Sequence, residues 1–136
     1  RTTARLVAAA HPLPSAAVTA LATAVSSAAG RSWSGCVLVA ATVLSGQLSI
    51  GWSNDLLDRT RDRISGRPDK PLATGAVPVG AVTAACALAL VATVPLSLAN
   101  GLAAGTAHLL GVAGGWAYNL GLKRTWASFL PYAVSR

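Results

Sequence analysis

Every acidic residue of this 136-residue chain lies in one stretch of fifteen: Asp55, Asp58, Asp62 and Asp69. Five of the eleven basic residues are interleaved with these aspartates or follow them directly: Arg59, Arg61, Arg63, Arg67 and Lys70. Acids and bases mixed in this way, beside a long apolar region, favour a site for a polyphosphate bridged by a metal ion.

The spacing of the aspartates indicates which side chains would act together. Asn54, Asp58 and Asp62 are four residues apart, and Asp55 is three residues before Asp58. On a continuous helix these positions form one stripe, and carboxylates so close repel one another unless a cation lies between them. Mg²⁺ prefers oxygen ligands and commonly binds one or two carboxylates together with substrate phosphates. We therefore predict a Mg²⁺ site that anchors a diphosphate. The alternative is that the aspartates pair with neighbouring arginines in a solvated loop, where such pairs contribute about 0–1 kcal/mol.

Three cationic side chains are candidates for diphosphate binding. Arg67 and Lys70 follow the stripe in a segment stiffened by two prolines, and Lys123 comes directly after a long uncharged run, on the same expected side. Arginine offers a planar fork to phosphate, and lysine offers a point charge. The alternative is that these residues only anchor the chain at the charged side of a membrane.

The rest of the sequence predicts the elements that position these residues. Hydrophobic residues make up 53% and charged residues 11% of the chain, and three uncharged runs cover 6–30, 32–54 and 71–122. A membrane span needs roughly 20 apolar residues. As one helix the third run would be about 78 Å long, so we expect it to fold back near Pro95, Asn100 and Gly101. This predicts an all-α transmembrane bundle with helices near 14–30, 34–57, 76–97 and 101–121, and the start of a fifth after Thr125.

The distribution of charge predicts a topology. The net charge is +7, but the cations lie between apolar runs and not on one face of a soluble fold, which argues against nucleic-acid binding. Arg1, Arg5, the 59–70 segment and Lys123 fall on one side of a four-helix path, and Arg31 falls on the other. The positive-inside rule makes the charged side cytoplasmic. The chain begins with Arg and contains no Met, so we expect a single membrane domain over 1–136 that is part of a longer protein.

The segments NDLLDRTRD and GRPDKPL resemble the first aspartate-rich motif of the UbiA superfamily of intramembrane prenyltransferases and the basic segment that follows it. YNLGLKR is similar to the Tyr-then-Lys segment after the fourth helix of that family. The resemblance covers the whole chain as the N-terminal half of such an enzyme. It implies transfer of an isoprenyl group from its diphosphate to an acceptor, often aromatic, within the lipid bilayer and with Mg²⁺.

The resemblance also implies roles for individual residues. Metal binding would fall to Asn54, Asp55, Asp58 and Asp62, diphosphate binding to Arg67, Lys70 and Lys123, and a place beside the reacting carbon or the phosphate to Tyr118. We assign catalysis to Asp58, Asp62 and Tyr118.

Three features depart from the family pattern. No acid follows Asp69, although the family has a second aspartate-rich motif in its C-terminal half, so we expect this piece alone to be inactive. His11-Pro12 stands where many members have Arg-Pro, and Tyr118 precedes Lys123 by five residues where many members use four.

Two other functions compete with catalysis. One is a degenerate, non-catalytic membrane protein that binds an isoprenyl diphosphate, and the other is a transporter fragment. Transporters place ionisable groups near the middle of the bilayer, whereas here the charges gather at one interface, which favours an enzyme for a charged head group. The acceptor, the prenyl chain length and the oligomeric state are not encoded in these motifs.

Overall fold

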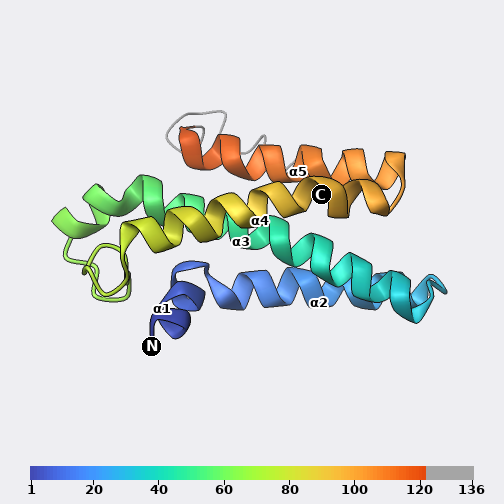
Figure 1. Cartoon of the computed structure of the whole chain (residues 1–136), viewed down its shortest axis with the longest axis horizontal. Coiled ribbons are helices and arrows are strands. Elements are labelled where there is room, and N and C mark those ends of the chain that lie inside the picture. Colours follow the sequence, from blue (N-terminus) through green and yellow to red (C-terminus); the bar gives the residue numbers. More distant parts are fainter. Residues whose placement is uncertain (122–136) are drawn as a thin grey trace.

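The computed structural model describes residues 1–121, and this part of the chain is helical without strands. The helices are α1 (Thr2–Ala9), α2 (Pro12–Ala28), α3 (Trp33–Ile64), α4 (Val79–Ala99) and α5 (Leu102–Leu120). Helices α2 to α5 run up and down beside one another, each antiparallel to the one before it (Figure 1). The prediction of an all-α bundle is confirmed, while the start of a fifth bundle helix lies outside the described residues.

The helix boundaries differ from the prediction in three places. Helix α3 continues to Ile64, seven residues beyond its expected end, and so includes the whole aspartate stripe. A short helix, α1, precedes the first expected one. Pro95 stays inside α4, and the chain reverses at Asn100-Gly101, where Gly101 has a φ of 104° that suits glycine.

Helix α3 is the centre of the bundle, because it packs against α2, α4 and α5. Several of its interior contacts are polar: Thr93 of α4 donates to Ser45 Oγ at 3.1 Å, and Trp116 of α5 donates to Ser49 Oγ at 3.3 Å. Such hydrogen bonds between helices, and small residues at their contacts, are typical of packing in a bilayer. Glycines permit the closest approaches: a Cβ on Gly105 would meet the backbone of Ser97.

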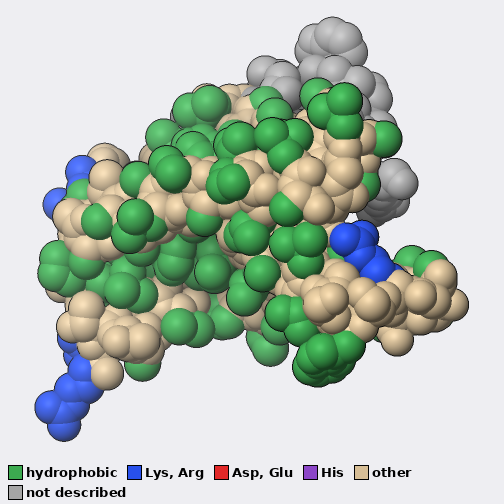
Figure 2. Space-filling model, turned by 45° about the vertical axis from the view of Figure 1, so that its right-hand side comes forward, with side chains coloured by type: hydrophobic (Ala, Val, Ile, Leu, Met, Phe, Trp, Pro, Cys, Tyr) green, Lys and Arg blue, Asp and Glu red, His purple; other side chains and the backbone are tan. Residues whose placement is uncertain are grey.

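The basic segments lie at one end of the bundle, as predicted. Arg5 donates to the carbonyl oxygen of Ala76 at 2.9 Å, which joins α1 to the loop between α3 and α4. At the opposite end Arg31 donates to Asn100 Oδ1 at 2.8 Å and links the other two turns. On the face shown in Figure 2, hydrophobic side chains extend along the bundle between Lys and Arg side chains near its ends.

Length and composition identify the helices that suit a membrane. Among the described residues, α3 and α4 are each long and apolar enough to span one, and α1 with α2 passes the same test as a pair bent by 70°. Helix α5 does not pass this test, because His108, Tyr118 and Asn119 lower its mean hydropathy.

The bend between α1 and α2 is fixed by local chemistry. His11 has a φ of 55° and a ψ of 67°, the left-handed region that few residues other than glycine adopt, and Pro12 begins α2. Helix α1 then docks on α3: Trp52 Nε1 donates to the Leu6 carbonyl oxygen at 2.8 Å, and the carbonyl of Ala10 lies against Gly51, where a Cβ would collide with it. This places His11 beside the start of the aspartate stripe.

Candidate functional site

The aspartate stripe is a buried feature of the last turns of α3 and not a solvated loop. Asp55 is 2% exposed, Asp58 4% and Asp62 6%. The helix continues through these residues, which is the condition for a common stripe, so the three carboxylates share one side of α3. Burial of several carboxylates in one place is costly unless cations or hydrogen bonds compensate them.

Asp55 is compensated by two side chains from other parts of the chain. Lys70 Nζ lies 2.8 Å from Asp55 Oδ1, and His11 Nε2 lies 2.8 Å from the same oxygen. Lys70 is itself only 9% exposed, and its Nζ is 3.2 Å from His11 Nε2. Asn54 Nδ2 completes the group at 3.5 Å from His11 Nε2. The loop after α3 and the bend before α2 therefore meet at the first aspartate.

Asp58 is engaged by an arginine of its own helix. Arg61 Nη2 lies 2.8 Å from Asp58 Oδ2, one turn along α3. The Arg61 side chain is 54% exposed while that of Asp58 is 5% exposed, so the arginine reaches over the carboxylate from the solvent side. This is one of the local pairs that the alternative interpretation of the motif expects, but on a buried helical face. Asp62 has no ion pair within residues 1–121.

Arg67 and Asp69 form a separate exposed pair. Arg67 Nε donates to Asp69 Oδ1 at 2.9 Å and Nη2 donates to Oδ2 at 2.7 Å. This bidentate contact lowers the pKa of Asp69 to about 2 and raises the pKa of Arg67. Asp69, which lies off the stripe, thus pairs locally, and Arg67, a predicted phosphate ligand, presents its fork to Asp69.

A pocket of about 340 Å³ opens between α2, α3 and α5 and reaches Asn54, the first residue of the stripe. From α3 it is lined by Gln47, Ile50, Gly51 and Asn54, which are spaced as one helical face. That face continues directly into Asp55, Asp58 and Asp62. The volume falls within the usual range for small-molecule sites, roughly 300–1,000 Å³.

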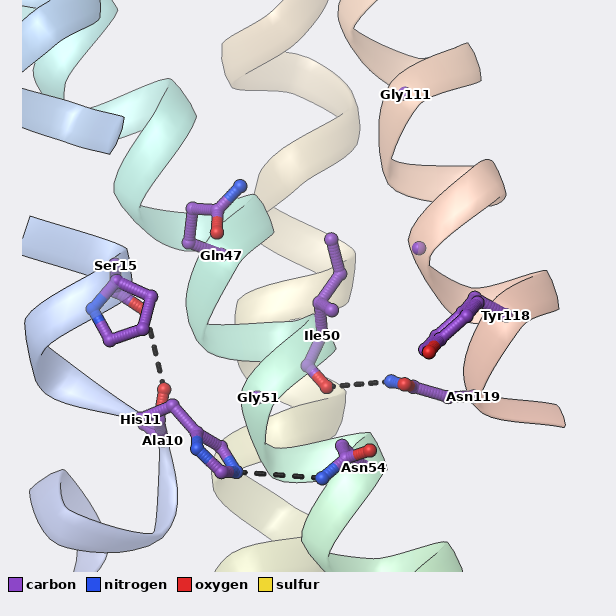
Figure 3. Close-up of a pocket in the computed structure, with 12 residues that line it drawn as sticks. Ala10, His11, Ser15, Gln47, Ile50, Gly51, Asn54, Gly111, Tyr118 and Asn119 are labelled. Carbon is purple, nitrogen blue, oxygen red and sulfur yellow. Dashed lines mark hydrogen bonds between the residues drawn. The ribbon is translucent and has the colours of Figure 1, made fainter. Parts of the chain in front are cut away.

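The other walls of the pocket come from α2 and α5 (Figure 3). Tyr118 and Asn119 face α3, and Asn119 Nδ2 donates to the carbonyl oxygen of Ile50 and to Ser53 Oγ, both at 2.8 Å. These hydrogen bonds fix the position of α5, and so of Tyr118, along the axis of α3 relative to the aspartate stripe. Tyr118 lines the pocket, whereas Lys123 lies outside the described residues.

Two residues of this site were not assigned from the sequence. His11 appeared only as a departure from an Arg-Pro pattern, and Asn119 only as the neighbour of Tyr118. The signal for His11 was its position before Pro12 at the start of an apolar run. The signal for Asn119 was a polar side chain inside an otherwise apolar helix.

The donor atoms at the stripe fit a hard divalent cation such as Mg²⁺. Asp55 Oδ2 is buried and has no hydrogen-bond partner among the described residues, and the neighbouring groups of the stripe are carboxylate and amide oxygens. The carboxylates of the stripe do not form a complete metal site by themselves. Within residues 1–121, no three His, Cys, Asp or Glu side chains lie close enough together to hold a metal ion. Ligand atoms from a substrate would have to complete such a site.

The fold and the site define a class of helical membrane protein with an apolar-walled pocket that opens onto a buried carboxylate stripe. Residues 15–134 match the model of the UbiA prenyltransferase family, and the chain belongs to this family. Membership implies intramembrane prenyltransferase activity in general terms. No curated protein and no solved structure matches the chain.

Proposed function

We propose that this chain binds an isoprenyl diphosphate with Mg²⁺ and provides half of a site that transfers the isoprenyl group to an acceptor, an aromatic ring in the first instance. The observation that carries the proposal is the single face of α3 on which the pocket wall passes into the buried aspartates. The diphosphate would lie at the aspartates and the hydrocarbon chain in the pocket. Since the basic segments share this end of the bundle, the positive-inside rule places the site on the cytoplasmic side of the cell membrane.

The transfer breaks the bond between the first prenyl carbon and the diphosphate oxygen, and the electron pair leaves with the diphosphate. The prenyl carbon then bonds to a ring carbon of the acceptor, and the ring proton passes to the released diphosphate. Mg²⁺, held by Asn54, Asp55, Asp58 and Asp62, would supply positive charge to the leaving group.

The remaining groups have distinct tasks. Lys70, already within 2.8 Å of Asp55, can donate to a diphosphate oxygen from the loop side, and Arg67 and Lys123 are proposed to add positive charge around it. The Tyr118 hydroxyl can donate toward the phosphate from across the pocket. Ile50, Pro14 and Ala10 exclude water from the developing carbocation.

The Lys70 contact with Asp55 favours this proposal over simple anchoring. A lysine that served only to hold the chain at the interface would keep its ammonium in water, but Lys70 is buried against the stripe. With a metal ion and a diphosphate bound, Asp55 would hold the metal ion and Lys70 would donate to the phosphate, so every charge would stay compensated.

The test compares aspartates inside and outside the stripe in the full-length protein. Asp58→Ala should lower prenyl transfer by at least about 10²-fold, the cost of losing one electrostatic contributor to a leaving group, and should weaken Mg²⁺-dependent binding of geranyl diphosphate. Asp69→Ala is the matched control and should retain most of both, because Asp69 is paired with Arg67 away from the stripe. Equal losses in the two variants would contradict the proposed site.

A further inference from the structure

The two glycines of Gly111-x-x-x-Gly115 on α5 have different surroundings. A Cβ on Gly115 would meet Ile50 Cδ1 at 2.6 Å, so this glycine permits α5 to pack against α3. A Cβ on Gly111 would meet no described atom within 4 Å. Packing therefore accounts for Gly115 and does not account for Gly111.

Backbone conformation does not account for Gly111 either. It lies inside α5, and it is not among the glycines with positive φ. Glycine inside a helix is less favourable than alanine, because more backbone freedom is lost on folding. The remaining feature of Gly111 is that it lines the pocket, where a side chain would take up space that is now open.

The position of Gly111 along the pocket indicates what that space holds. Tyr118 is seven residues from Gly111, which places Gly111 about 10 Å farther along the helix axis. In Figure 3, Gly111 lies at the top of the view, Gln47 lies between, and His11 and Asn54 lie at the bottom. The aspartate stripe continues directly after Asn54. The polar end suits the diphosphate, and the far end suits a hydrocarbon chain.

We infer that Gly111 determines the length of isoprenyl chain that the pocket accepts. This inference rests on the proposed function, because it places the diphosphate at the aspartates. A side chain at position 111 would fill the far end and exclude the last methylene groups of a long chain, while a short chain would still fit.

The experiment measures binding of geranyl, farnesyl and geranylgeranyl diphosphate, in Mg²⁺, to the full-length protein in detergent. The variants are Gly111→Ala, Gly111→Val and Gly111→Leu. Each buried methylene contributes roughly fourfold in affinity, so exclusion of two or more should weaken binding of the longest diphosphate by about tenfold or more. Geranyl diphosphate should keep its wild-type affinity, and the loss should grow with side-chain size.

Gly80→Leu is the matched control. Gly80 is also a helical glycine with no described atom within 4 Å of an added Cβ, but it is exposed on α4 and does not line the pocket. It should change the affinity for none of the three diphosphates. Thermal unfolding of all variants identifies any that fail to fold, and Gly111→Ala, the smallest change, then provides the comparison.

The outcomes separate the two proposals. If the wild-type protein bound none of the diphosphates in Mg²⁺, the proposed function would be wrong. If the wild type bound them and Gly111→Leu weakened all three equally, or none, the assignment of Gly111 to chain length would be wrong.

Discussion

At the scale of single residues, Asp55 is held by His11 and Lys70, which come from two distant parts of the chain. Helical periodicity alone places Asp55, Asp58 and Asp62 on one side of a continuous helix. The contact between His11 and Asp55 depends on a left-handed residue and a bent helix pair that bring positions 44 residues apart to 2.8 Å. No local pattern encodes such a contact.

The ion pair between Arg67 and Asp69 leads to a prediction of the pH at which Asp69 titrates. The pKa of Asp69 is lowered to about 2 from its ordinary value of 3.8, mainly by the hydrogen bond from Arg67. Because the carboxyl pKa is lowered, the stabilisation from the ion pair is fully present above the ordinary pKa of aspartate. It is lost as the pH falls toward 2 and the carboxylate is protonated. The NMR titration of the Asp69 carboxyl carbon should have its midpoint near that value. In Arg67→Ala the midpoint should rise toward about 3.9, the usual value for aspartate, and an unchanged midpoint would show that Arg67 is not the cause.

At the scale of helices, the apolar runs predicted which elements exist but not where all of them end. The expected ranges for α2, α4 and α5 agree with the structure within a few residues. The expected end of α3, near residue 57, was wrong, since the helix continues to Ile64. A helix can pass from lipid into the interface without interruption when its backbone hydrogen bonds remain satisfied internally. Helix α1 was missed because its second half, residues 6–9, belongs to the uncharged run 6–30, in which a single helix was expected.

The close contact of the α1–α2 bend with α3 can be tested through Gly51. A Cβ at this position would collide with the carbonyl of Ala10, and the backbone cannot move aside as a flexible side chain could. Gly51→Ala should therefore lower the free energy of unfolding by about 1–3 kcal/mol, the usual cost of overpacking. Gly80→Ala, where an added Cβ meets open space, should be neutral or stabilising by up to about 1 kcal/mol. Thermal or chemical unfolding in detergent measures both, and equal stability of the two variants would argue against the tight contact.

At the scale of the whole molecule, the up-and-down path puts α1 and the loop after α3 at one end and the turn at Arg31 at the other. At each end a hydrogen bond links neighbouring segments, Arg5 to Ala76 at one end and Arg31 to Asn100 at the other. The fold therefore fixes which basic residues lie at which end. The proposal that the end with α1 faces the cytoplasm rests on the positive-inside rule.

Labelling from each side of the membrane tests this orientation. Ser65 lies just after α3 and Ser27 lies in the last turn of α2, and both are exposed. In a background in which Cys36 and Cys86 are replaced by Ser, Ser65→Cys should react with a membrane-impermeant maleimide only after the cells are opened. Ser27→Cys should react in intact spheroplasts. Reaction of both from the same side would rule out the proposed path.

The common face of α3 has a consequence for how this sequence can change. The pocket wall and the carboxylates lie on the same side of α3 only because the helix between them is continuous. Each residue turns the helix by about 100°. One residue inserted between Gln47 and Asn54 would leave the sequence motif intact and turn it away from the pocket. An insertion of a full turn would restore the direction but shift the carboxylates by about 5.4 Å along the axis. Point substitutions can therefore adjust the cavity independently of the charged end, whereas a change of chain length in this helix would alter both at once.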